Sequence, residues 1–190
     1  MNADGSSRAR SARPQGDNSK PIEPAGRVSA ELLVRALTGA DTRALTDLAR
    51  ACDETYLEWT PKGWMVPEAP TGWANKYLLP EAWIEGAFDP SSDQLVATVA
   101  FRPSDVAADV AHVGLVFTHP SRWREGLAGS LLSRAEAEMV VRGYVSEILW
   151  TPDGAPAEAF YRSRGWERDG RTEWHPWVGL QMVGYARDLP

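Results

Sequence analysis

The sequence predicts a single α/β (α+β) domain, built from a mixed β-sheet with helices on both of its faces. Strand-like and helix-like segments follow one another in the order strand, helix, three strands, helix, strand, helix, two strands. The 190 residues suffice for one domain of ordinary size and a tail. Apolar residues make up 43% and charged residues 24%, as is usual for globular proteins.

The N-terminal segment, residues 1–26, is rich in Ser, Arg, Pro, Gly and Asp, and Ile22 is its only large aliphatic residue after Met1. Such a segment buries too little apolar surface to offset the entropy of ordering. We therefore expect a disordered tail over 1–26 and a single domain over 27–190.

The first part of the domain combines regular elements with a long irregular stretch. We expect a strand over 31–37 and a helix over 42–53, with Asp41 as its N-cap, because apolar residues recur there at helical spacing. Four prolines interrupt residues 55–80, which also hold several tryptophans. Short turns and loops are expected there.

The middle of the chain predicts a hairpin and a third strand. Residues 82–88 and 94–102 flank the turn sequence DPSSD, which favours an antiparallel hairpin. Residues 110–118 form another apolar run that ends before a proline. Gly114 within this strand is compatible with a β-bulge.

The C-terminal half predicts two helices and three strands. The clearest helix covers 127–142, where apolar residues share one face and charged residues repeat at four-residue spacing on another. A strand over 145–150, a short helix over 155–164 and strands over 166–174 and 178–188 complete the domain.

The segment between the strand 110–118 and the helix 127–142 is the most informative about function. Small residues, Gly126, Ala128 and Gly129, stand where the helix begins. Small residues allow close backbone approach, and the first turn of a helix presents unpaired N–H groups and partial positive charge. Strand, loop and helix start together predict an anion-binding site.

This segment resembles the acetyl-CoA motif of the GNAT N-acetyltransferases, Gln/Arg-x-x-Gly-x-Gly/Ala after a strand and a proline-containing loop. Gly126 and Ala128 match the motif, whereas Trp123 stands at its first position, flanked by Arg122 and Arg124. The resemblance implies a mostly antiparallel GNAT-type sheet of six to seven strands with about four helices, and acetyl-CoA as acyl donor.

The resemblance also implies which residues hold this co-substrate. The strand carrying Thr118 pairs with the pantetheine arm, and the amide near Thr118 serves as an oxyanion donor. The residues implied to bind acetyl-CoA are Val116, Phe117, Thr118, Arg124, Glu125, Gly126, Leu127, Ala128, Gly129 and Ser130.

A second segment resembles the other GNAT signature, Ala-x-x-hydrophobic-Tyr-x-x-x-Gly-Phe. Ala157, Phe160, Tyr161 and Gly165 match it, while Gly154 stands where Asn is usual. The family assigns the matching tyrosine as the acid that protonates the departing thiolate, so Tyr161 is the implied catalytic acid.

The sequence leaves several candidates for the general base. His112 occupies the position of a Glu in the histone-acetylating branch, and imidazole titrates near neutral pH. Glu85, Asp109 or ordered water are alternatives. Three scattered histidines and a lone cysteine, Cys52, do not make a metal site, so we expect no metal.

Composition narrows the partners and the compartment. A net charge of −6 argues against nucleic acid, and no apolar run approaches the roughly 20 residues that span a bilayer. A single cysteine and the lack of a secretory signal favour the cytoplasm. A homodimer is compatible with the final strands.

The predicted reaction is transfer of an acetyl group from acetyl-CoA to a primary amine of a small molecule. Aromatic residues within 56–83, with Trp174 and Trp177 opposite, are the expected acceptor wall, and Asp53, Glu54 and Glu58 can attract an amine. The alternatives are a protein amine or a bulkier acyl-CoA, or a degenerate GNAT fold that senses acyl-CoA or mediates interactions.

Overall fold

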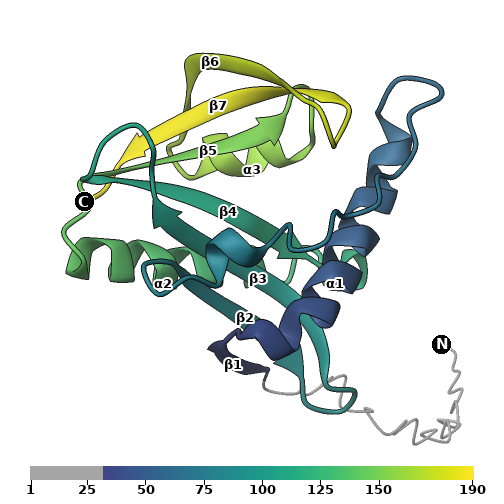
Figure 1. Cartoon of the computed structure of the whole chain (residues 1–190), viewed down its shortest axis with the longest axis horizontal. Helices are drawn as coiled ribbons and strands as arrows, with labels where there is room; N and C mark the ends of the chain where they lie inside the picture. Colours follow the sequence, from purple (N-terminus) through teal and green to yellow (C-terminus); the bar gives the residue numbers. More distant parts are fainter. Residues whose placement is uncertain (1–31) are drawn as a thin grey trace, which may run out of the picture.

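The computed structural model describes residues 32–190, so the predictions made for residues 1–26 lie outside the described residues (Figure 1). Within the described part, seven strands form one sheet and three α-helices flank it. The strands are β1 (Leu33–Ala36), β2 (Trp83–Asp89), β3 (Gln94–Pro103), β4 (Val110–Thr118), β5 (Ser146–Pro152), β6 (Glu167–His175) and β7 (Leu180–Asp188). The helices are α1 (Thr42–Glu54), α2 (Leu127–Val141) and α3 (Ala157–Ser163).

The sheet has the order β1-β2-β3-β4-β5-β7-β6, and only the pair β4–β5 is parallel. The predicted hairpin is confirmed, since β2 and β3 pair antiparallel from Trp83↔Phe101 to Asp89↔Gln94. The parallel pair needs a crossover connection, which α2 supplies. The predicted mostly antiparallel, helix-flanked sheet is therefore confirmed, with three α-helices and four short 3-10 helices in the described residues.

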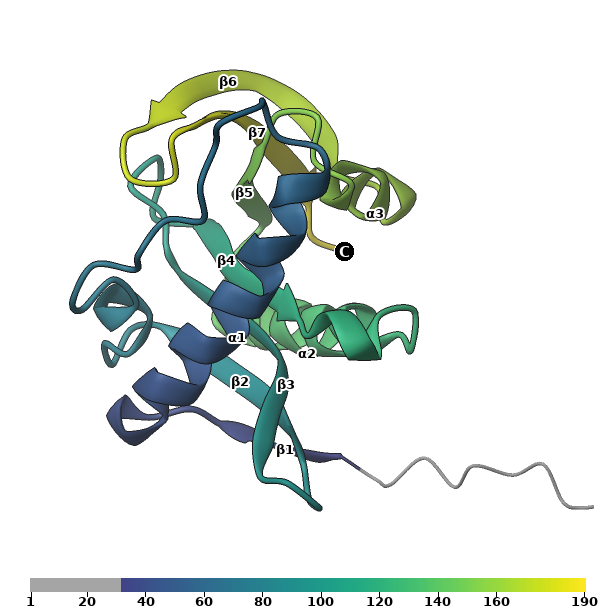
Figure 2. The same ribbon diagram turned by 90° about the vertical axis from the view of Figure 1, so that its right-hand side faces the viewer.

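The helices cover both faces of the sheet, as Figure 2 shows for α1 and α2. Leu45, Leu48 and Cys52 of α1 pack in one buried cluster. Leu132 and Met139 of α2 belong to a second cluster, which also contains a tyrosine of α3. Two buried clusters with the sheet between them explain why β3 and β4 need apolar residues on both faces.

The helix α1 begins where the sequence predicts, and Asp41 stands at the predicted N-cap position. The Asp41 carboxylate makes no capping bond to α1. It accepts hydrogen bonds from the Arg35 guanidinium at 2.7 and 3.0 Å and from the Thr38 amide at 2.9 Å. These bonds hold the pKa of Asp41 at about 2, because they stabilise the ionised carboxylate.

The strand β4 contains the bulge that Gly114 suggested. Its register with β3 shifts between Thr98↔Phe117 and Ala100↔Gly114, and Leu115 adopts φ = +52°. A Cβ on Gly114 would lie 2.0 Å from the Tyr77 hydroxyl oxygen, so glycine is needed for that ring to pack against the strand. The bulge redirects the rest of β4, and this prepares the site described next.

Candidate active site

The parallel strands β4 and β5 pair at their N-terminal ends and then diverge. They pair only from Val110↔Ser146 to His112↔Ile148, after which β5 continues beside β7. Figure 1 shows the two strands diverging from that point. The second half of β4 therefore turns one backbone edge toward an opening instead of toward a neighbouring strand.

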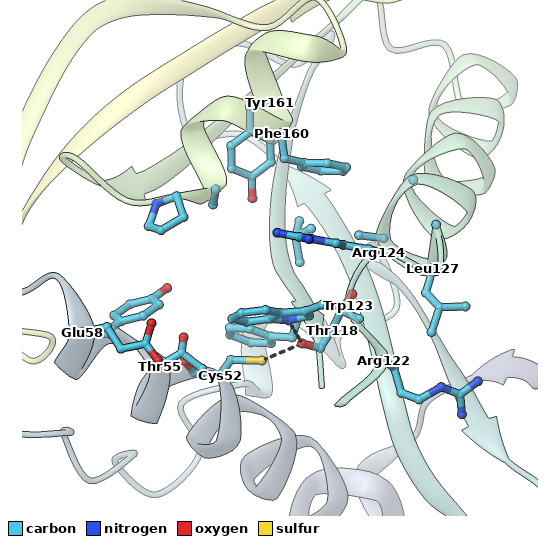
Figure 3. Close-up of a pocket in the computed structure, with 18 of the residues that line it drawn as sticks. Cys52, Thr55, Glu58, Thr118, Arg122, Trp123, Arg124, Leu127, Phe160 and Tyr161 are labelled. Atoms are coloured by element: carbon cyan, nitrogen blue, oxygen red, sulfur yellow. Dashed lines mark hydrogen bonds between the residues drawn. The ribbon is translucent and has the colours of Figure 1, made fainter. Parts of the chain in front are cut away.

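A cavity of about 530 Å³ fills this opening. One wall is the end of β4, a second is α3, a third is the C-terminal end of α1 with the turn after it, and the N-terminus of α2 closes one end (Figure 3). Its lining residues are Cys52, Thr55, Tyr56, Glu58, Trp59, Val116, Phe117, Thr118, Arg122, Trp123, Arg124, Gly126, Leu127, Ala128, Gly129, Pro156, Ala157, Phe160 and Tyr161. An apolar channel that ends at a helix N-terminus fits a long ligand with an anionic end.

The N-terminus of α2 has the features of an anion site. Gly126 is its N-cap with φ = +80°, and no side chain caps the helix. The first helical bond runs from the Ser130 amide to the Gly126 carbonyl at 2.9 Å, so the amides before Ser130 remain for a ligand. A Cβ on Gly126 would meet no atom within 4 Å, so the positive φ, not crowding within the protein, requires glycine there.

The two arginines of this loop have different roles. Arg122 forms ion pairs with Asp89 at 3.2 Å and Glu125 at 2.8 Å, and so holds the loop against the end of β2. Arg124, in contrast, has no carboxylate of residues 32–190 within ion-pair distance, and Figure 3 shows it extending into the cavity. Arg124 is thus the arginine available to an anionic ligand.

Trp123, which stands at the first motif position, ties the loop to β4. Its indole Nε1 donates to the Thr118 carbonyl at 2.7 Å, and the Cys52 thiol donates to the same oxygen at 3.3 Å. Burial raises the pKa of Cys52 to about 12, so the thiol stays protonated and can donate. Because the N–H and C=O of one strand residue point to the same side, the Thr118 amide faces the opening as well.

Tyr161 projects from α3 into the same cavity. Its hydroxyl oxygen points toward the cavity in Figure 3, and its ring packs against Trp166 and Tyr185 with centroid separations of 6.0 and 6.1 Å. The side chain is 6% exposed, and burial raises the pKa of Tyr161 above its usual range. The phenol therefore stays protonated near neutral pH.

The short helix α3 is held in place by a buried carboxylate. Glu158 is 3% exposed and accepts hydrogen bonds from Arg168, from the Tyr185 hydroxyl and, at 2.7 Å, from the Gly154 amide. This bond fixes the turn at Gly154, although Gly154 lacks the Asn side chain that the family motif usually has at this position. This network fixes the helix that carries Tyr161.

His112 lies at the vertex of the opening and does not line the cavity. Its Nδ1 is 3.4 Å from the Arg102 guanidinium. Burial and the positive charges of Arg102, Lys76 and Arg171 lower the pKa of His112 to about 4. Glu125 and Ser130, also predicted to bind the donor, lie outside the lining, where Glu125 serves as the partner of Arg122.

The Trp-rich stretch lies against the turn between β6 and β7. Trp73 is 6.0 Å from Trp177 between centroids, and the Trp177 indole donates to the Glu68 carbonyl at 2.7 Å. Trp177 therefore lies opposite the Trp-rich stretch, as expected from the sequence. Trp174, by contrast, is 62% exposed on β6.

Two cavity residues, Cys52 and Thr55, were not predicted from the sequence as part of the site. Both lie at the C-terminal end of α1, where Cys52 reads as one more apolar residue at helical spacing. The packing of α1 against β3 and β4, including the contact of Cys52 with Thr118, 66 residues away, brings them to the cavity.

A family model described as the acetyltransferase (GNAT) family matches residues 45–166, which span the end of β4, the α2 N-terminus and α3. The chain belongs to the GNAT acetyltransferase family. No curated protein sequence matches the chain significantly.

No helix of residues 32–190 is long and apolar enough to cross a membrane. Those residues also hold no cluster of three or more potential metal-ligating side chains.

Solved GNAT structures share the fold at low sequence identity. A GNAT-family acetyltransferase from Staphylococcus aureus Mu50 superposes with a TM-score of 0.66 at 14% identity, covering 84% of this chain and all of that one. The ribosomal-protein-S18-alanine N-acetyltransferase from Escherichia coli gives 0.61 at 19%, covering 84% and 94%. An aminoglycoside 6'-N-acetyltransferase complexed with coenzyme A gives 0.62 at 16%, covering 83% and 97%.

Proposed function

We propose that this GNAT protein transfers an acetyl group from acetyl-CoA to a primary amine of a small molecule. The observation that carries the proposal is the single cavity that joins an uncapped helix N-terminus, an open strand edge and a buried tyrosine hydroxyl. The complex of a structurally similar aminoglycoside acetyltransferase with coenzyme A supports the choice of donor, and its acceptor is a small molecule.

The residues fit such a donor. The pyrophosphate binds the free amides at the start of α2 and the Arg124 guanidinium, while the pantetheine arm lies along the β4 edge. Acetyl-CoA supplies an activated acyl carbon at the inner end of the channel.

Two groups of the chain stabilise the charge that develops during attack. The Thr118 amide faces the opening and donates to the carbonyl oxygen as it becomes an oxyanion. The Tyr161 hydroxyl donates to the sulfur as the C–S bond breaks. Because the thiol of a free cysteine has a pKa of about 8.5, well below that of a buried phenol, Tyr161 stabilises the thiolate chiefly by a hydrogen bond and gives up its proton only transiently.

The acceptor amine must lose a proton, and we propose that His112 takes it through water. His112 is neutral near pH 7, but a pKa of about 4 makes it a weak base, and it lies outside the cavity lining, so it can accept the proton only transiently and through water. Glu85 is engaged with Arg134 at 2.6 Å, and Asp109 is exposed, so neither is better placed. A pH–rate profile that is identical in His112→Gln and wild type removes His112 and leaves water alone.

Calorimetric titration with acetyl-CoA, free CoA and a longer acyl-CoA tests the proposal first. Micromolar binding of acetyl-CoA, followed by release of free thiol when amines are added, is the expected result. Absence of binding for every CoA compound contradicts the transferase function. If thiol is released only from the longer acyl-CoA, the acyltransferase function stands and only the choice of the acetyl group is contradicted.

A further inference from the structure

The cavity has opposite charges at its two ends. Arg124 lines it beside the start of α2, next to Arg122, whose charge is paired with Asp89 and Glu125. Glu58 is the only carboxylate among the lining residues. Figure 3 shows Glu58 and Arg122 on opposite sides of the cavity. An anionic ligand is attracted to one end, and a cation to the other.

The surroundings of Glu58 are suited to an organic cation. Tyr56 and Trp59 line the same end, with ring centroids 4.9 Å apart. Aromatic ring faces attract ammonium groups, and a neighbouring carboxylate adds to this attraction. No cationic side chain of residues 32–190 lies within ion-pair distance of Glu58, which is exposed at the cavity mouth, where an acceptor enters from solvent.

The attacking nitrogen is a poor partner for Glu58. A primary amine has a pKa of about 10 and must be neutral to attack, whereas a nearby carboxylate stabilises its protonated form. Glu58 therefore suits a second amino group, one that remains charged throughout the reaction.

We propose that the acceptor is a small molecule with at least two amino groups, one of which stays protonated between Glu58, Tyr56 and Trp59 while the other is acylated. This inference rests on the proposed function and names its substrate class. The neutral nitrogen forms a C–N bond to the acyl carbon, the C–S bond breaks and its electron pair leaves with sulfur. The nitrogen loses one proton and the thiolate gains one, so the reaction is balanced.

The test compares acceptors of matched length: 1,4-diaminobutane, butylamine and 4-aminobutanoate, with 1,6-diaminohexane and hexylamine as a longer pair. The diamines should exceed their monoamines in kcat/KM by about three- to tenfold, the range for a partly exposed carboxylate and aromatic rings, and 4-aminobutanoate should be poorest. Glu58→Gln should abolish this preference and leave the Kd of acetyl-CoA unchanged.

Glu54→Gln is the matched control, because Glu54 ends α1, pairs with Arg50 at 3.4 Å and does not line the cavity. It removes the same charge nearby and should keep the preference for diamines. Equal use of diamines and monoamines overturns the inference, as does a preference that survives Glu58→Gln. Turnover of none of these amines by protein that binds acetyl-CoA also overturns it, without touching the donor assignment.

A binding measurement separates this inference from the proposed function. The binding of 1,4-diaminobutane is monitored through the broadening of its proton NMR signals. If acetyl-CoA does not bind, the transferase function fails. Broadening by wild type that Glu58→Gln removes then still supports the cation site. Broadening that is equal in both proteins, or absent from both, overturns it.

Discussion

The indole Nε1 of Trp123 lies 2.7 Å from the carbonyl oxygen of Thr118 and donates a hydrogen bond to it. This bond links the loop before α2 to the end of β4, so the proposed anion site and the open strand edge are held in one arrangement. The same carbonyl accepts the Cys52 thiol, which adds the end of α1 to the contact. Trp123 thereby gives the motif a structural link at the position where the family has a polar side chain.

Trp123→Phe keeps the ring and removes this hydrogen bond. A net hydrogen bond contributes about 0.5–1.5 kcal/mol, so the Kd of acetyl-CoA should rise about two- to tenfold while the protein remains folded. Calorimetric titration measures the change. Trp174→Phe, on the exposed face of β6, is the control and should bind as wild type does. Equal affinity of Trp123→Phe and wild type means that the link does not organise the site.

Gly126 and Gly143 offer a matched pair at the two ends of α2. Their φ angles are +80° and +86°, and a Cβ on either meets no protein atom within 4 Å. Alanine at each position should cost about 1–2 kcal/mol of unfolding free energy, because the left-handed conformation disfavours a side chain. Only Gly126→Ala should also lose affinity for acetyl-CoA, by at least tenfold. Equal affinity in both variants would contradict the phosphate-binding role of this loop.

The sequence predicts most elements well because their signals are local. Helical spacing of apolar residues in 127–142 and turn chemistry between 82–88 and 94–102 need no knowledge of the rest of the fold. Asp41 shows the limit, since its carboxylate does not cap α1 but pairs with Arg35 and accepts from the Thr38 amide in the capping box of the preceding 3-10 helix. A stronger partner overrides a local preference.

The site was predictable where motifs carry it and unpredictable where distant segments meet. Gly126 and Tyr161 lie in the cavity as the motifs imply. The separation of β4 from β5 depends on strand pairing, which no local pattern encodes. Cys52 likewise reaches the cavity through its contact with Thr118, far along the chain.

Tyr161→Phe removes the hydroxyl group that we propose donates to the leaving sulfur. Loss of one preorganised hydrogen-bond donor to developing negative charge typically lowers kcat by about 10²–10³-fold, so kcat should fall by about 10²-fold or more, while the Kd of acetyl-CoA changes less than about twofold. Steady-state kinetics and calorimetry separate the two effects. Tyr144→Phe, which does not line the cavity, controls for the substitution itself. Full activity of Tyr161→Phe excludes the hydroxyl from the mechanism.

Gly114→Ala tests the packing that shapes the bulge of β4. The new methyl group would lie 2.0 Å from the Tyr77 hydroxyl oxygen and 2.6 Å from the ring carbon that bears it, so the strand or the ring must move. Overpacking of this kind should destabilise the fold by about 1–3 kcal/mol in urea denaturation. Gly39→Ala, where a Cβ has open space and φ is not positive, should be nearly neutral. Equal stability of the two variants would show that Tyr77 adjusts freely.

His112 should make the stability of the fold depend on pH. Its pKa is about 4 in the folded protein and about 6.5 when unfolded, so between these values the unfolded chain binds more protons. The contribution of neutral His112 to the free energy of unfolding is therefore fully present above about pH 6.5 and is lost as the pH falls toward 4. The wild-type free energy of unfolding, relative to His112→Gln, should drop by about 1–3 kcal/mol between pH 7 and pH 4. Urea denaturation of both proteins across this range measures the difference, and parallel curves would contradict a half-buried His112 that is neutral in the folded protein.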